Sequence, residues 1–279
     1  MSDIIPVEGG RSPEEMAAAL GATSAPKGPK NYALKINSQG EDKQGNQIPL
    51  GAFFLNTGNE RVYAKEGVRL QPFSNHIQFM HWGDGTLINK SRLILNQREE
   101  ARDQLGGVMC GMPTYDESRA MNPDQRKVHE GKDRYRVVRA LVSYTGKTAS
   151  GEERTIENQP CILSLKRKNY GPFYHDVSNK MPNDTALWDF ESVLTAERHK
   201  TDKGATYYVM RFAPQFTNRL PYDQMTYDSM SAVDSIVSAE NARIDASYKE
   251  ALERKQDADE QDRIMEDVDT LEADFDRVG

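Results

Sequence analysis

Residues 187–214, LWDFESVLTAERHKTDKGATYYVMRFAP, predict a β-hairpin, and this hairpin decides the fold class. Apolar and polar residues alternate on both sides of TDKG, as they do in strands that bury one face. TDKG itself contains the turn-forming residues that close hairpins. The side chains that share one face within each strand are Trp188, Phe190 and Leu194, and Tyr208, Met210 and Phe212. The pattern indicates an antiparallel sheet.

Two further stretches predict long strands, namely RYRVVRALVSY (134–144) and QPCILSLKRK (159–168). The segment between them, GKTASGEERTIEN, predicts the loop of a long hairpin. Between residues 32 and 95, short aromatic stretches alternate with segments rich in turn-forming residues, which is typical of several short strands. We therefore expect an α+β protein with a β-rich antiparallel core, either OB-like or an unusual fold, together with a C-terminal helix and flexible ends.

Helices are also predicted, including a short one at SPEEMAAAL (12–20). NQREEARDQL (96–105) predicts a short helix with Asn96 as its N-cap. From about residue 222 the chain predicts one polar helix with a thin apolar stripe. The expected organisation is a flexible N-terminal segment at 1–31, a β-rich body at 32–221, a helix at 222–256 and a disordered acidic tail at 257–279.

The charge of the chain is concentrated at its C-terminal end. The formal net charge is −7, but residues 257–279 alone contain ten Asp or Glu and two Arg, a net of −8. The rest of the chain has 34 basic and 33 acidic residues, a net of +1. A terminal block of one sign is typical of an interaction tail. The sequence thus combines a mildly basic body with a strongly acidic tail.

The sequence lacks the motifs of the common enzyme classes. It contains no P-loop, no GxGxxG after a predicted strand, no GxSxG and no HExxH. Cys110 and Cys161 lie far apart, and no CxxC pair suggests zinc. On a strand, His76 and His81 would point to opposite faces because their numbers differ by an odd count. We expect no catalytic activity, no metal and no cofactor.

The cysteine count and the hydropathy pattern indicate a compartment. Two cysteines argue against a disulfide framework and for a reducing environment. No apolar run approaches the roughly 20 residues of a transmembrane helix. The N-terminus lacks the basic start and apolar stretch of a signal peptide. We expect a cytoplasmic protein without a membrane partner.

The stretch KRKNYGPFYH (166–175) places three cations directly beside aromatic rings. In proteins that bind single-stranded nucleic acid, cations hold the phosphates and rings stack on unpaired bases. The alternative is a solvated strand end followed by aromatic residues that fill the core. The candidate binding residues are Lys166, Arg167, Lys168, Tyr170, Phe173 and Tyr174.

A second basic cluster lies on RYRVVRALVSY, where Arg134 and Arg136 share one face and Arg139 lies on the other. The alternative role for these arginines is solubility alone. If this strand pairs with QPCILSLKRK as a hairpin, its arginines would lie near Lys166 and Lys168. Such proximity would favour a binding role for both clusters.

A third basic cluster surrounds the predicted hairpin tip AERHKTDKG (196–204), with Arg198, Lys200 and Lys203 as candidates. Basic hairpin tips can act as fingers that contact nucleic acid, because their cations lie away from the rest of the sheet. The alternative is an inert loop.

The layout of the chain resembles that of the single-stranded DNA-binding proteins of tailed bacteriophages. It combines a β-rich, mildly basic body, the basic and aromatic strand end KRKNYGPFYH and an acidic tail with a late Phe275. Within that group it looks most like the DNA-binding cofactors of phages that carry an RNA polymerase in the virion. The resemblance implies a protein that holds opened middle promoters and recruits a second phage polymerase. It concerns layout, so it assigns no role to individual residues.

These observations predict a protein that binds single-stranded DNA in phage transcription or replication, in the host cell cytoplasm. The acidic tail would recruit a phage RNA polymerase or a replication protein. The same tail could also compete for the basic groove of the body and weaken loose binding. The alternative is a structural or assembly protein of a phage particle, which would use the C-terminal helix and tail for protein contacts only.

Overall fold

The computed structural model describes most of the chain after residue 31. The described residues are 32–41, 45–57, 61–109, 115–123, 126 and 131–278. By its internal contacts the chain divides into Met1–Lys30 and Asn31–Gly279. The segment 1–31, predicted to be flexible with a short helix at 12–20, and Cys110 lie outside the described residues.

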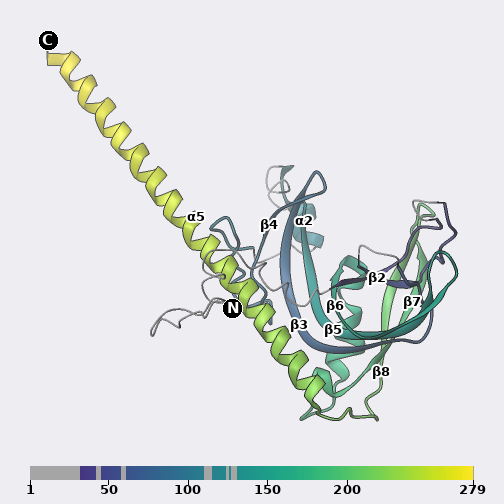
Figure 1. Ribbon diagram of the computed structural model, residues 1–279. Helices are drawn as coiled ribbons and strands as arrows, with labels where there is room; N and C mark the ends of the chain where they lie inside the picture. Colours follow the sequence, from purple (N-terminus) through teal and green to yellow (C-terminus); the bar gives the residue numbers. More distant parts are fainter. Residues whose placement is uncertain are drawn as a thin grey trace, which may run out of the picture. The chain divides into compact units, whose positions relative to one another are not determined.

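The described part contains eight strands and several helices (Figure 1). The strands are β1 (Tyr32–Ile36), β2 (Phe53–Asn56), β3 (Val68–Gly83), β4 (Thr86–Lys90), β5 (Lys132–Lys147), β6 (Glu153–Lys166), β7 (Ser192–Lys200) and β8 (Thr206–Pro214). The α-helices are α2 (Tyr115–Ala120), α4 (Pro172–Asp176) and α5 (Gln224–Val278), and the 3-10 helices are η1 (Arg167–Asn169), η2 (Ser178–Lys180) and η3 (Leu187–Asp189).

All eight strands belong to one sheet, in the order β2-β1-β6-β5-β3-β7-β8, with β4 paired to β3. Every pairing is antiparallel except that of β1 with β6. This confirms the predicted α+β class with a β-rich antiparallel core and a C-terminal helix. The OB-like variant is not confirmed, because an OB fold is a five-stranded barrel.

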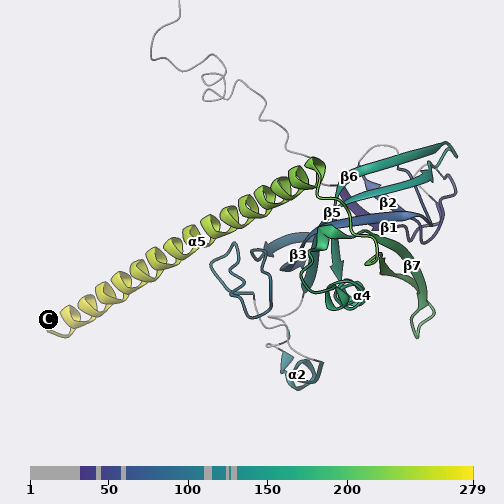
Figure 2. The ribbon, with the colours of Figure 1, turned by 90° about the horizontal axis from the view of Figure 1, so that it is seen from below.

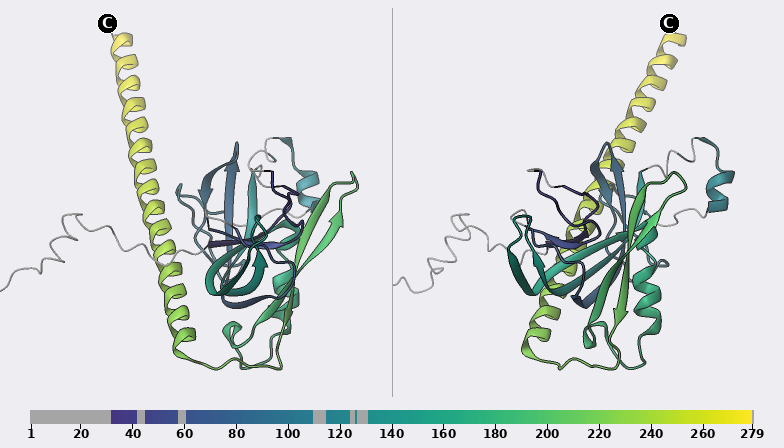
Figure 3. Two further views of the ribbon diagram at one scale, coloured as in Figure 1. Left: turned by 45° about the vertical axis from the view of Figure 1, so that its right-hand side comes forward. Right: turned by 90° about the vertical axis from the view of Figure 1, so that its right-hand side faces the viewer.

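Both predicted hairpins are present. Strands β5 and β6 pair from Tyr135 opposite Lys166 to Lys147 opposite Glu153. Both strands therefore extend into the segment GKTASGEERTIEN, which was predicted to be the loop of this hairpin. Strands β7 and β8 pair from Ser192 opposite Pro214 to Lys200 opposite Thr206, and form the green hairpin in Figure 3. In both hairpins, the alternation of apolar and polar residues predicted the pairing.

The sheet curls around a single main core. Phe53 of β2 and Phe212 of β8 belong to the same buried cluster, although their strands lie at opposite ends of the sheet order. The middle of this cluster is formed by inward-facing residues of β5 and β6, such as Val138 and Leu163. The two outer strands therefore approach each other around these residues, and Figure 1 shows the strong bend of the long strands β3 and β5.

The prediction of a helix at 96–105 is wrong, because these residues form a loop. The local capping contacts do form, because the Asn96 backbone N–H donates to the Glu99 carboxylate and Asn96 Oδ1 accepts from the N–H of Arg98. The chain then turns back instead of continuing as a helix, with bridges that join Ser91 to Asp103 and Arg102 to Val108. Tertiary packing overrides the local signal here.

The reversal of this segment depends on Gly106. Its φ of +71° lies in the left-handed region, which favours glycine. A Cβ at this position would also lie 3.2 Å from the Cβ of Ala251 on α5. The close approach of α5 therefore fixes this loop, which sequence periodicity could not show.

The C-terminal helix is longer than predicted. Helix α5 runs without interruption from Gln224 to Val278 and so includes the acidic segment expected to be disordered. Asp223 caps its start, since Asp223 Oδ1 accepts from the N–H of Thr226 at 2.8 Å. No Gly or Pro occurs between 224 and 278, and the acidic segment contains Leu, Glu, Met, Arg and Ala, which favour helix. The high charge of the acidic segment predicted that it is surrounded by water, but a segment surrounded by water can still form a helix.

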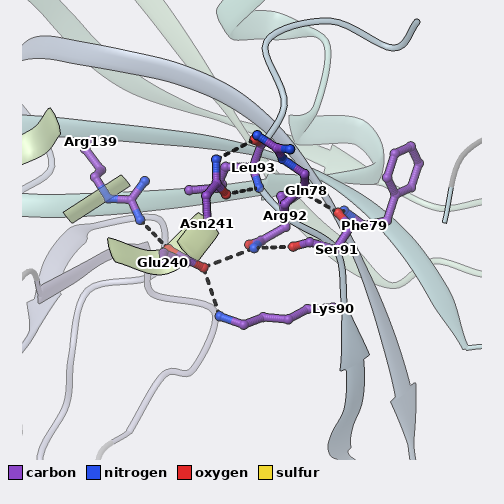
Figure 4. A network of polar contacts seen from close by, with 9 residues as sticks. All are labelled: Gln78, Phe79, Lys90, Ser91, Arg92, Leu93, Arg139, Glu240 and Asn241. Carbon is purple, nitrogen blue, oxygen red and sulfur yellow. Dashed lines mark hydrogen bonds and ion pairs between the residues drawn. The ribbon is translucent and has the colours of Figure 1, made fainter. Parts of the chain in front are cut away.

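A network of polar contacts holds α5 on the sheet (Figure 4). The Glu240 carboxylate accepts from Arg139 Nη2 at 2.7 Å, from Lys90 Nζ at 2.9 Å and from Gln78 Nε2 at 3.0 Å. The Asn241 side chain pairs with both backbone groups of Leu93, at 2.7 and 3.0 Å. Burial acts to raise the pKa of Glu240, but the hydrogen bonds and the charges of Lys90 and Arg139 lower it below its ordinary value.

None of the helices in the described part of the chain has both the length and the apolar character that crossing a bilayer requires.

Candidate nucleic-acid interface

The end of β6 forms one corner of the candidate site. Strand β6 ends at Lys166, and Arg167 takes a φ of +52°, so the chain turns sharply into η1. Asn169 then fixes the turn on the edge of β8, because its side chain accepts from the N–H of Met210 at 2.6 Å and donates to the carbonyl of Tyr208 at 3.4 Å. The basic stretch is thus held in a defined place on the sheet.

Two of the predicted clusters meet at this corner. The guanidinium carbons of Arg134 and Arg136 lie 4.3 and 4.8 Å from the ring centroid of Tyr170. Arg136 also donates to the carbonyl of Tyr170 at 3.0 Å and to Asn75 Oδ1 at 2.7 Å. Its guanidinium carbon lies 5.7 Å from the ring of Tyr174, which is 45% exposed. We refer to Arg134, Arg136, Tyr170 and Tyr174 as the arginine–tyrosine cluster.

The predicted pairing of 134–144 with 159–168 is confirmed, and it brings Arg134 and Arg136 beside the turn that follows Lys166. Lys166 itself lies opposite Tyr135, so alternation places its side chain on the other face of the sheet from Arg134 and Arg136. Burial lowers the pKa of Arg136, and the charge of Arg134 acts in the same direction, whereas Tyr170 opposes it. An arginine keeps its proton in proteins. Arg136 is only 7% exposed, however, so Arg134 is the partly accessible cation beside the rings. This geometry suits a cation–π contact.

Asp133 holds two of the three predicted cations of the strand end. Its carboxylate lies 2.8 Å from Lys166 Nζ and 3.3 Å from Arg167 Nε. Burial acts to raise the pKa of Asp133, but the hydrogen bond and charge of Lys166, with Arg167, lower it overall. Lys168 is exposed and forms no ion pair with the described residues. In the free protein, Lys166 and Arg167 are therefore already paired.

Two predicted contact residues belong to the interior instead. Phe173 is fully buried and packs edge-to-face on Phe212, with ring centroids 5.2 Å apart. It lies on the inner side of α4, whereas its neighbour Tyr174 lies on the outer side. Arg139 is 2% exposed and paired with Glu240, because α5 covers the face of β5 from which it projects. Neither residue can reach a nucleic acid in this structure.

The β7–β8 hairpin carries the third predicted cluster. Strand β3 pairs with β7 at 192–194, so the rest of β7 has β8 as its only strand partner in the described part of the chain. The hairpin consequently projects beyond the neighbouring strands (Figure 2). Arg198, Lys200 and Lys203 are exposed on it.

The same hairpin carries a pair of stacked rings that was not predicted from the sequence. His199 stacks on Tyr207, with ring centroids 5.4 Å apart and an interplanar angle of 20°. The two residues are cross-strand partners. Counting back across the predicted TDKG turn would have identified this pair, since opposite residues in a hairpin lie on the same face.

A groove between the end of β6 and the β7–β8 hairpin was also not predicted from the sequence. It has a volume of about 350 Å³ and lies between β1, β6 and β8. Lys166 lines it at the end of β6, and Tyr207 lines it near the tip of the β7–β8 hairpin. The other lining residues are Leu34, Lys35, Ile36, Ser38, Ser164, Leu165, Asn169, Thr206, Tyr208 and Met210.

Within the described ranges, no three His, Cys, Asp or Glu side chains lie close enough together to hold a metal ion. The fully buried Cys161 has its pKa raised by desolvation and belongs to the core. The described part of the site therefore offers cations, ring faces and a groove. No family model matches this chain, and no curated protein or solved structure is significantly similar to it.

Proposed function

We propose that this protein binds single-stranded DNA and catalyses no reaction on it. The observation that supports this function best is the arginine–tyrosine cluster, in which two guanidinium groups lie over Tyr170 beside the exposed ring of Tyr174. Cations next to accessible rings suit a strand whose phosphates and base faces are both free. The exposed cations Lys168, Arg198, Lys200 and Lys203 would extend the phosphate contacts.

The long helix α5 supports a role for protein contacts. Its described contacts with the body extend to Lys255, whose Nζ donates to the carbonyl of Gly106 at 3.3 Å, and the helix continues to Val278. We propose that the acidic segment recruits a phage RNA polymerase or a replication protein, as the layout of the sequence suggests. The same helix also suits the alternative function, that of a structural or assembly protein of a phage particle.

The first prediction separates these two functions. The protein is expected to bind single-stranded DNA at least about tenfold more tightly than duplex, because stacking needs free base faces. Affinity is expected to fall about tenfold or more between about 50 and 200 mM salt, since cations release counterions from the phosphates they contact. Gel shifts or fluorescence anisotropy with matched oligonucleotides measure both. Equal binding to duplex, or no binding to either, would favour the structural alternative.

The second prediction concerns Asp133. Changing Asp133→Asn is expected to tighten binding of single-stranded DNA, because it releases Lys166 and Arg167 from their ion pairs. The slope of affinity against salt concentration, on logarithmic axes, is expected to steepen by about 0.7 for each cation that gains a phosphate. Anisotropy titrations at several salt concentrations give both quantities.

Glu157→Gln is the matched control, because Glu157 is exposed near the opposite end of β6 and loses the same charge. It should leave affinity almost unchanged. If Asp133→Asn and Glu157→Gln bind alike, Lys166 and Arg167 make no contact with DNA.

A further inference from the structure

The groove exists because β1 and β6 separate. They pair in parallel only at Tyr32 with Cys161 and at Ala33 with Ile162. Strand β6 then continues to Lys166 and β1 to Ile36 without further pairing to each other. On the other side, β8 is the last strand of the sheet. The groove is therefore bordered by strand edges, and on the edge of β8 the N–H of Met210 and the carbonyl of Tyr208 are already bonded to Asn169.

The two sides of the groove differ in chemistry. Leu34, Leu165 and Met210 belong to the main core and supply an apolar floor. Tyr208 packs on Gly51 beneath, where a Cβ would lie 2.7 Å from its Cε1. Alternation along a strand places Lys35, Ser164, Lys166 and Tyr207 on the opposite, outer side. The outer side thus combines a ring with two cations.

The charges indicate an anionic occupant. The two charged residues among the described lining residues, Lys35 and Lys166, are both cations. Lys166 is paired with Asp133, which lies outside the groove lining, so a phosphate would share Lys166 with that carboxylate. Lys35 is exposed and forms no ion pair with the described residues. One face of the Tyr207 ring lies on His199, which holds the ring in place while it borders the groove. A phosphate beside a base matches this combination of groups better than a neutral ligand does.

We propose that this groove takes one unpaired nucleotide of the bound strand. Its base lies along Tyr207, and its phosphate contacts Lys35 and Lys166. The hydroxyls of Ser164 and Thr206 are available to the sugar and base edges, whereas the Asn169 side chain is already bonded to β8. The proposal rests on the proposed function and goes beyond it, since it places a single nucleotide between the end of β6 and the hairpin.

The test fills the groove without removing a charge. Ser164→Trp is expected to weaken binding of an oligothymidylate of about twelve nucleotides by about tenfold, the order of one lost stacking contact. The melting temperature should stay close to that of the wild type, since Ser164 is exposed. Ser164→Ala, which leaves the groove open, is the matched control and should bind like the wild type.

A second variant keeps the test decisive if Ser164→Trp folds poorly. Lys35→Ala retains the groove and is expected to flatten the salt slope by about 0.7, the value for one lost phosphate contact on a single strand. If the wild type binds oligothymidylate and both variants bind it equally well, the groove holds no nucleotide, although the proposed function stands. If the wild type itself does not bind oligothymidylate, the proposed function is wrong, and the groove assignment that rests on it is wrong too.

An acidic peptide is the competing occupant, since strand edges can pair with an extended chain. A fluorescent polyglutamate peptide serves as the probe. Loss of peptide binding in Ser164→Trp, with oligothymidylate binding retained, would overturn the nucleotide assignment. Loss of oligothymidylate binding alone supports it.

Discussion

Replacing Glu240 with Ala is expected to lower the free energy of unfolding by about 3–5 kcal/mol, the usual cost of removing one residue of a buried ion pair. The Arg139 side chain is 3% exposed and would keep its charge with no carboxylate beside it. Its Nε and Nη1 already have no hydrogen-bond partner among the described residues. Lys90 and Gln78 would lose the same acceptor. Urea unfolding followed by circular dichroism measures the loss.

Glu253→Ala is the matched control for this experiment. Glu253 is an exposed residue of the same helix, and an exposed substitution of this kind usually changes stability by less than about 0.5 kcal/mol. Similar small effects for Glu240→Ala and Glu253→Ala would contradict the view that the polar network holds α5 on the sheet.

The same carboxylate makes the attachment of α5 depend on pH. The pKa of Glu240 is lower in the folded protein than its ordinary value of 4.5. A carboxyl group of this kind stabilises the folded state fully above its ordinary pKa, and the stabilisation is lost as the pH falls through the lowered value. Unfolding measured from neutral to acidic pH should therefore show a loss of stability that Glu240→Ala lacks.

Replacing Phe173 with Ala is also expected to cost about 3–5 kcal/mol of unfolding free energy, because it removes a fully buried ring from the main core. For a domain of this size, the melting temperature should fall by roughly 10 °C. Binding of single-stranded DNA should persist at temperatures where the variant is folded. Thermal melts beside binding titrations measure both effects.

Tyr174→Ala is the matched control, since Tyr174 is the next residue of α4 but is 45% exposed. It should change the melting temperature little and weaken DNA binding by roughly 1–3 kcal/mol, the cost of one lost stacking contact. If Tyr174→Ala destabilises the fold as strongly as Phe173→Ala and leaves binding unchanged, Tyr174 serves packing only.

The sheet was predictable where its strands alternate in polarity. The 187–214 hairpin and the pairing of 134–144 with 159–168 follow from alternation and turn residues alone. The pairing also brought the arginines of β5 to the strand end, as expected. Local signals failed where distant packing decides, as at 96–105, which α5 and the neighbouring bridges hold as a loop.

The sequence predicted which residues lie near the candidate site, but not which of them are exposed to solvent. Strand parity placed Arg139 on the face opposite Arg136, but it could not show that α5 covers that face. Phe173 and Tyr174 are adjacent in sequence, and only the short helix α4 decides which of them faces the core. The groove requires knowledge of where β1 leaves β6, a non-local feature with no sequence signal of its own.

The continuity of α5 has a mechanical consequence. From Glu240, where the helix is fixed to β5, to Val278 the rise of an α-helix carries the chain about 57 Å. Figure 1 shows this part running as a straight rod away from the sheet. A stiff rod cannot fold back onto the surface from which it departs. Under the proposed function, its acidic end therefore lies out of reach of the cations of the same molecule, and it would serve as an extended arm that a second macromolecule binds while the sheet holds the strand.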